Sequence, residues 1–79
     1  MALSVDVTIP PEILPDGAEG AIAIWLVQDG ETVAAGSVIA EVMNEKAALE
    51  LLAPASGRLS IVVAAEVPVK AGEVVARIS

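Results

Sequence analysis

The sequence contains no cysteine and no histidine, and Trp25 is its one aromatic residue. These absences exclude a thiol nucleophile, an imidazole acid or base, a Ser-His-Asp triad and a metal site built on Cys or His. The remaining residues offer no acid-base constellation of the kind that an active site needs, so we predict a non-catalytic protein with no metal site. Any redox chemistry would have to be supplied by a cofactor.

Basic residues and long hydrophobic runs are also scarce. Four Lys and Arg residues stand against eleven Asp and Glu residues, which gives a net charge of −7. This is the wrong sign for binding nucleic acid or an anionic membrane. The longest apolar run, from Ala21 to Val27, is far shorter than the ~20 residues that span a bilayer, and the first residues lack the basic start of a signal peptide. We therefore expect a soluble, cytoplasmic protein whose charged partners are basic.

Small and β-branched side chains dominate what the sequence does contain. Ala accounts for 15 of the 79 residues, and Val and Ile together account for 19. Pro and Gly recur at short intervals, and no window of a dozen residues keeps a helical period without a breaker, so the composition predicts an all-β protein. A chain of this length can bury about 60% of its surface, which suits one small domain covering residues 1–79.

Alternating apolar residues and turn signals predict about eight short extended segments. They are residues 4–9, 21–27, 31–33, 37–43, 49–53, 58–65, the corner at 66–69, and 73–78. The loop from Pro10 to Glu19 is rich in turn residues but contains the apolar pair Ile13 and Leu14. This pair either folds back as a lid on the core or forms a contact site for a partner.

An internal repeat divides the chain into two similar halves, because residues 33–42 align with residues 69–78. Each half is too small to bury its own apolar face, so we expect the halves to pack as paired sheets related by a pseudo-twofold axis. The predicted fold is a flattened barrel or sandwich of two antiparallel sheets, each of about four strands. One corner departs from the repeat, because Glu66 stands where the first half has Gly30, and we expect this corner to be reshaped.

The segment from Glu41 to Leu51 predicts a hairpin that presents Lys46. Its tip is Asn44-Glu45-Lys46, in which Asn favours the first position of a type I turn and Glu and Lys tolerate the two central positions. A lysine at such a tip is fully solvated. It can be a turn residue that discourages edge pairing, or an attachment point for a group that must protrude from the body. The residues expected to face inward on the two strands are Val38, Ala40, Val42, Leu49, Leu51 and Ala53.

Three stretches of the sequence stand out by their order and spacing. They are residues 19–33, residues 35–47 with the motif Glu45-Lys46-Ala47, and residues 49–57. Together they resemble the biotinyl/lipoyl carrier-domain family, over a length from about Val7 to Ile78. The resemblance implies that Lys46 carries a covalently attached cofactor. The residues that would shape its presentation are Asn44, Glu45 and Ala47.

The neighbours of Lys46 divide this family into two cofactor classes. Biotin acceptors carry Met on both sides of the lysine, whereas the neighbours here are Glu45 and Ala47, and Met43 lies three positions before the lysine. The match is to the lipoyl pattern Asp-Lys-Ala, with Glu in place of Asp. The resemblance therefore implies lipoate on Lys46, with biotin as the alternative.

As a lipoyl domain, the chain would act in a 2-oxo acid dehydrogenase-type complex, as a domain of a dihydrolipoyl acyltransferase or as a free-standing carrier. A lipoate ligase or lipoyl-transfer enzymes would modify Lys46, whose swinging arm would then pass acyl groups and reducing equivalents between active sites. The implied partners are a thiamine-diphosphate-dependent decarboxylase, an acyltransferase and a dihydrolipoyl dehydrogenase.

The surroundings of the hairpin leave further alternatives open. In the family, the loop corresponding to Pro10–Glu19 lies near the modified lysine and helps the decarboxylase to recognise it. Glu41 and Glu50 flank the lysine either as a solvated charged face or as docking residues. A third function, from another class, is an unmodified β-domain that serves as a structural or interaction module.

Overall fold

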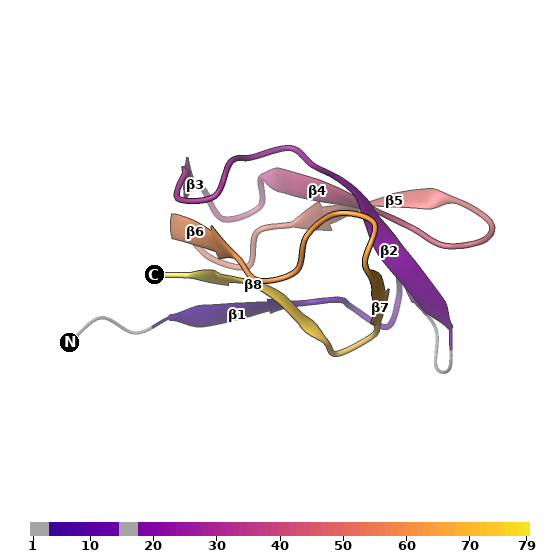
Figure 1. The fold of residues 1–79 in the computed structure, drawn as a ribbon. Helices are drawn as coiled ribbons and strands as arrows, with labels where there is room; N and C mark the ends of the chain where they lie inside the picture. The colour runs from indigo at the N-terminus through magenta and orange to yellow at the C-terminus, as the bar shows by residue number, and fades with distance from the viewer. Residues whose placement is uncertain (1–3, 15–17) are drawn as a thin grey trace.

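The computed structural model of the protein describes residues 4–14 and 18–79 (Figure 1). The strands are β1 (Val5–Thr8), β2 (Glu19–Trp25), β3 (Thr32–Val33), β4 (Val38–Met43), β5 (Ala48–Leu52), β6 (Gly57–Ile61), β7 (Pro68–Lys70) and β8 (Val74–Ile78). The described residues contain no helix, so the all-β prediction is confirmed. This part of the chain therefore has no helix that could cross a membrane. Part of the predicted loop, residues 15–17, lies outside the described residues.

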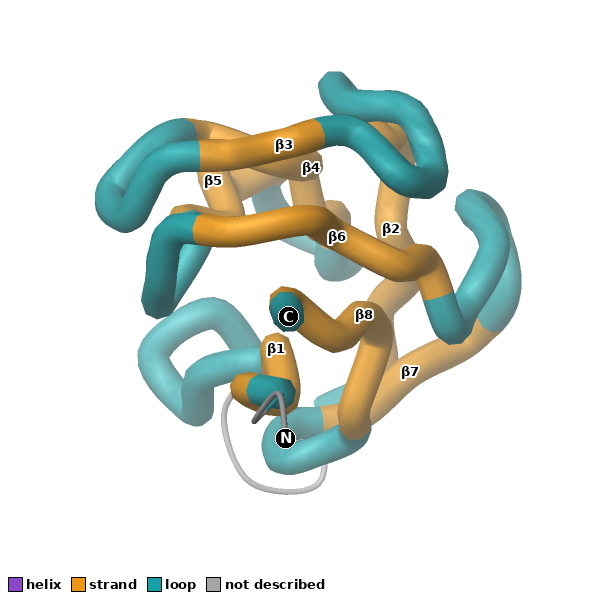
Figure 2. Tube along the Cα trace, turned by 90° about the vertical axis from the view of Figure 1, so that its left-hand side faces the viewer, coloured by secondary structure: helices purple, strands orange, loops and turns teal. Residues whose placement is uncertain are grey.

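The strands form two antiparallel sheets of four strands each. The order is β1-β8-β6-β3 in the first sheet and β5-β4-β2-β7 in the second. In the end-on view of Figure 2, the strands of both sheets surround a common interior. Because the sheets share no strand, the fold is a sandwich rather than a closed barrel.

Both sheets follow one pattern. Exchanging strands that lie four apart in chain order, β1 with β5, β2 with β6, β3 with β7 and β4 with β8, converts one sheet order into the other. The turns that lead into β4 and β8 agree as well, because Gly36 and Gly72 have φ values of 87° and 85°. This positive φ is the left-handed region that glycine enters without steric cost. The strand order thus confirms the internal repeat. It corrects the expectation that the two halves pack as paired sheets, because each sheet contains two strands from each half of the chain.

Aliphatic side chains fill the interior of the sandwich. Its largest fully buried members are Ile9, Leu14, Ile22, Ile39, Leu51, Leu59 and Ile78. Full burial of a side chain of this size contributes about 1.5–3 kcal/mol. Ile13 is 8% exposed and Leu14 is 0% exposed, so the interpretation of this pair as a lid on the core is confirmed.

The corner before β7 contradicts the prediction that it is reshaped. Glu66 adopts a φ of 73°, close to the 88° of Gly30 in the first half. The backbone N–H of Glu66 donates to Ile22 O at 2.8 Å, just as the N–H of Gly30 donates to Leu59 O at 2.7 Å. The repeat therefore keeps its backbone geometry and places a non-glycine residue in a conformation that costs about 1 kcal/mol or more.

Two predictions about the strands near the hairpin need correction. Strand β2 covers Glu19–Trp25 rather than residues 21–27, because its first residues pair with β7. Leu49, expected to face inward, is 39% exposed, although its cross-strand partner Val42 is fully buried. Strand β5 is at the edge of its sheet, so no further strand covers Leu49 on the outer side. Leu51 and Ala53 are buried as predicted.

The molecule is elongated, with extents of 38 × 20 × 20 Å. The hairpin that joins β4 and β5 lies at one end, and the start of β1 and the C-terminus lie at the other (Figure 1). In terms of the repeat, the connection equivalent to this hairpin would join β8 to β1. The tip between β4 and β5 is thus the feature of the fold that its pseudo-symmetry does not duplicate.

Candidate functional site

A tight four-residue turn forms the hairpin tip. The last pair of the ladder is Met43 and Ala48, and beyond it the Asn44 N–H donates to Ala47 O at 2.9 Å. The Asn44 side-chain Oδ1 accepts hydrogen bonds from the backbone N–H groups of Lys46, at 2.8 Å, and Ala47, at 2.9 Å. Asn at the first position of the turn therefore replaces the usual backbone acceptor with its own side chain.

The conformation of the tip agrees with the predicted type I turn. Glu66 is the one non-glycine residue with positive φ in the described chain, so neither Glu45 nor Lys46 has the positive φ that the primed hairpin turns require. Glu45, Lys46 and Ala47 are all exposed, whereas Asn44 is half-buried. The sequence therefore predicted both the turn and the exposure of the lysine.

Lys46 stands on a base that is packed into the core, and no described carboxylate forms an ion pair with it. The strand that leads to it carries Ile39 and Val42, each fully buried in the core. Within residues 4–14 and 18–79 the one ion pair joins Arg77 Nε to Asp6 Oδ1 at 3.2 Å, so no described carboxylate is paired with Lys46. An accessible amine at the end of a rigidly held turn is suited to carrying an attached group.

The turn at residues 10–14 is tied to the hairpin tip. Asn44 Nδ2 donates a hydrogen bond to Ile13 O at 3.2 Å. The turn itself is closed by the Ile13 and Leu14 N–H groups, which both donate to Pro10 O. Nothing in the sequence pattern signals this bond, because its two residues lie 31 positions apart.

A glycine beneath the tip allows β2 to pass close to the end of β4. A Cβ added at Gly20 would collide with the backbone O of Met43 and would stand 2.7 Å from Leu14 Cδ2. Leu14 and the base of the hairpin therefore both lie close to Gly20, and glycine is the one residue type that leaves room for both. This contact is a second connection between the 10–14 turn and the hairpin.

Acidic residues surround the hairpin strands. Glu41 of β4 and Glu50 of β5 are direct cross-strand partners, and Glu45 stands at the tip. The other lysine, Lys70, is the last residue of β7 rather than part of a turn, and it pairs across the sheet with Glu19. Lys46 is accordingly the lysine that the fold presents at a protruding tip.

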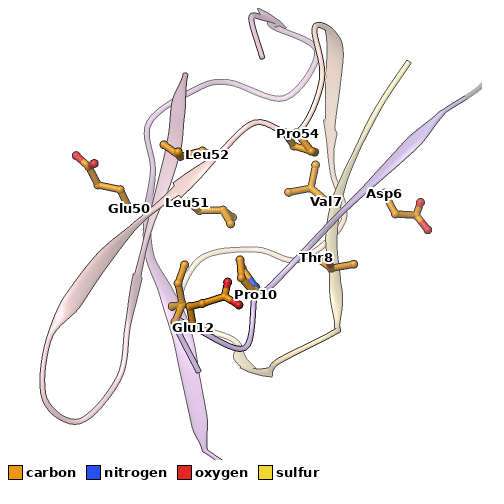
Figure 3. A pocket seen from close by; sticks show the side chains of 10 residues that line it. Asp6, Val7, Thr8, Pro10, Glu12, Glu50, Leu51, Leu52 and Pro54 are labelled. Carbon is orange, nitrogen blue, oxygen red and sulfur yellow. The ribbon is translucent and has the colours of Figure 1, made fainter. Parts of the chain in front are cut away.

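A groove of about 410 Å³ runs between edge strands β1 and β5 (Figure 3). Its lining residues are Asp6, Val7, Thr8, Pro10, Glu12, Ile13, Glu50, Leu51, Leu52 and Pro54. In Figure 3, the carboxyl groups of Asp6 and Glu50 point away from the groove, while Val7 and Leu51 line its interior. The groove holds no nucleophile paired with a base, and the described residues contain no cluster of acidic side chains placed to hold a metal ion.

Comparisons with known proteins match most of the sequence of this chain. A family model described as "Biotin-requiring enzyme" (Biotin_lipoyl) matches residues 7–78. Component 3 of the dihydrolipoyllysine-residue acetyltransferase of the mitochondrial pyruvate dehydrogenase complex from Arabidopsis thaliana is 40% identical over 68 residues, which cover 84% of this chain and 13% of the relative. The corresponding components from Rhizobium meliloti and Staphylococcus aureus are each 36% identical, over 77% and 86% of this chain and 13% and 16% of the relatives. The chain thus corresponds to a small part of the length of each relative.

Proposed function

Because the chain belongs to the biotin/lipoyl domain family, we propose that it is a lipoyl carrier domain with its cofactor on Nζ of Lys46. The observation that carries this proposal is the tip itself. Lys46 is exposed on a two-strand hairpin whose turn is capped by Asn44 and whose strands are anchored in the core. Such a tip is open to a modifying enzyme and rigid enough to define where the attached arm begins.

Lipoate is favoured over biotin by the immediate neighbours of the lysine. Glu45 and Ala47 match the lipoyl motif, and neither position carries the Met that biotin acceptors show. The relatives cited above are named dihydrolipoyllysine-residue acetyltransferases, which supports the same choice. The family model alone is compatible with either cofactor.

The residues at the tip fit an amide-linked arm. Attachment joins the carboxyl carbon of the cofactor to Lys46 Nζ with net loss of water, coupled to ATP cleavage, and it removes the positive charge of the lysine. No described side chain has to move away from the amine first, because no described carboxylate is paired with it. When bound, lipoate supplies a disulfide that can be reductively acylated and later reoxidised.

The protein part of the carrier acts by presentation and tethering. The packed sheets hold the base of the hairpin, and the hairpin between β4 and β5 lies at one end of the molecule (Figure 1), so that an arm on Lys46 would start from that end. A tethered group reaches an effective concentration of roughly millimolar at each site that it can visit. We propose that this non-catalytic domain serves a thiamine-diphosphate-dependent decarboxylase, an acyltransferase and a dihydrolipoyl dehydrogenase, as part of a 2-oxo acid dehydrogenase-type complex.

The proposal is tested by incubating the purified chain with a lipoate ligase, lipoate and ATP, and measuring the intact mass. We expect one lipoyl adduct on the wild type and on Lys70→Gln, and none on Lys46→Gln. Lys70→Gln is the matched control, because it removes an exposed lysine of the same sheet that does not stand at a tip. An adduct on Lys46→Gln, or none on the wild type, would contradict the proposal.

A parallel reaction with a biotin ligase and biotin separates the two cofactors. A biotin adduct on Lys46 with no lipoyl adduct would replace the lipoyl carrier by a biotin carboxyl carrier. Absence of both adducts, together with a binding partner that is indifferent to Lys46→Gln, would instead favour an unmodified interaction module.

A further inference from the structure

The side-chain amide of Asn44 forms hydrogen bonds in two directions. Its Oδ1 caps the hairpin turn through the N–H groups of Lys46 and Ala47. Its Nδ2 reaches out of the hairpin and donates to Ile13 O, in a segment that is remote in sequence. One half-buried side chain therefore fixes both the shape of the tip and the position of the tip relative to the 10–14 turn.

The 10–14 turn has an inner and an outer side. Ile13 and Leu14 are buried and seat it on the core, whereas Pro11 and Glu12 are exposed. Because Asn44 binds the carbonyl of Ile13, the exposed part of this turn is held at a fixed place beside the hairpin. The exposed residues of the turn and the hairpin tip are therefore held in a fixed arrangement through Asn44.

We propose that Asn44 is a positioning residue that couples the 10–14 turn to the tip, so that a lipoate ligase recognises both as one surface. This inference rests on the proposed function, because it assigns a determinant of recognition for modification of Lys46. The role belongs to Nδ2 and is separate from the capping of the turn by Oδ1. Loss of the coupling weakens recognition and leaves the reactive amine as it was.

The two roles can be separated by substitution, because only an amide combines the acceptor and the donor. In Asn44→Asp, the ionised carboxylate keeps an acceptor for the turn but has no hydrogen to donate to Ile13 O. In Asn44→Ser, the hydroxyl also keeps an oxygen that is favoured at the first position of a type I turn, but the side chain is shorter and carries no amide donor. Both variants therefore retain the cap and lose the coupling, and they differ in charge.

The first experiment measures ligase kinetics on the full chain, with lipoate and ATP, for the wild type, Asn44→Asp and Asn44→Ser. We expect kcat/KM for the protein substrate to fall about threefold to tenfold in both variants, the range that follows from losing one ordinary hydrogen bond. The fall should lie in KM, with kcat unchanged, because recognition is weakened and the amine is not. Agreement between the charged and the neutral variant shows that the added charge is not the cause.

The second experiment measures hydrogen exchange in the unmodified proteins. Exchange of the Ile13 and Leu14 amides should accelerate about threefold to tenfold in both variants, since the turn that they close is no longer held by Asn44. The Val42 amide, on a buried position of β4, should exchange as in the wild type and serves as the control for global stability.

The outcomes separate this inference from the proposed function. Wild-type kinetics in both variants, on a protein whose wild type is lipoylated, would overturn the positioning role and leave the carrier function intact. Unchanged exchange at Ile13 and Leu14 would overturn the coupling itself. A wild type that takes no lipoyl group would overturn the carrier function and, with it, recognition by the ligase.

Discussion

The two sheets of the molecule carry different charge pairs at equivalent positions. On β1 and β8, Asp6 faces Arg77, and the two side chains form an exposed ion pair at 3.2 Å. On β5 and β4, which occupy the same places in the repeat, Glu50 faces Glu41. Opposite charges across a strand pair stabilise a sheet by about 0.2–1 kcal/mol, and like charges destabilise it.

The difference lies in the side chains near the hairpin and not in the backbone. The backbone is nearly the same in both halves, down to the positive φ of Gly36 and Gly72. The side chains depart from the repeat around Lys46, where the strands keep a like-charged pair that weakens their own pairing. The like-charged pair therefore slightly weakens the sheet that carries the tip and keeps the base of the tip acidic.

The largest effect is expected at Gly20 and Gly57, the glycines at which two segments of each half pass close to each other. Gly20→Ala would force a Cβ against Met43 O and Leu14, and Gly57→Ala, at the equivalent place, would force one against Ser79 O and Ile78. Overpacking of this kind costs about 1–3 kcal/mol. Thermal unfolding should show a Tm lower by about 4–8 °C per kcal/mol. If only one of the two variants is destabilised, the halves are not equivalent in their packing.

The corner glycine offers a paired test of the next size. Gly30→Ala should destabilise the protein by about 1–2 kcal/mol, because Ala is forced into the left-handed region. Glu66→Gly should stabilise it by about 0.5–1 kcal/mol, because the strained residue becomes the type that the first half already uses. Urea unfolding measures both values. Destabilisation by Glu66→Gly would show that the Glu66 side chain contributes more than its backbone costs.

Reversing one charge of the hairpin pair should make the two sheets alike at this position. Glu41→Arg places opposite charges across β4 and β5, and we expect a gain of about 0.2–1 kcal/mol in the free energy of unfolding. Glu73→Arg changes the net charge equally at an exposed turn away from the pair and serves as the control. An equal gain in both variants would mean that net charge, and not the pairing of Glu41 with Glu50, sets the effect.

The smallest effect is expected at the ion pair of the other sheet. Asp6→Asn removes the partner of Arg77, but both side chains are more than half exposed. Exposed pairs contribute about 0–1 kcal/mol, and salt screens them. We expect a loss of at most about 0.5 kcal/mol at low ionic strength, which disappears in high salt. A larger loss that persists in salt would contradict this account of the pair.

Much of the fold follows from patterns that are local in the sequence. Alternation of apolar residues predicted the strands, and the match of residues 33–42 with residues 69–78 predicted two related sheets. The tip was predictable for the same reason, because Asn44 and its turn partners lie within four positions of one another. The comparisons bear out the family resemblance, while the role of Lys46 stays a proposal.

The features that escaped prediction depend on contacts between remote segments. Glu66 keeps a positive φ because the fold around it fixes the hydrogen bond of its N–H to Ile22 O. Leu49 is exposed because β5 is an edge strand, which the alternation along a single strand does not reveal. The bond from Asn44 to Ile13 joins segments that only the packed structure brings together.

The most direct test of the central claim is the mass of the protein recovered from its native source, with the modified residue located by fragmentation. We predict a single lipoyl group on Lys46 and an unmodified Lys70. A biotin adduct, an adduct on another residue, or an unmodified protein from cells that lipoylate their other carriers would contradict the claim.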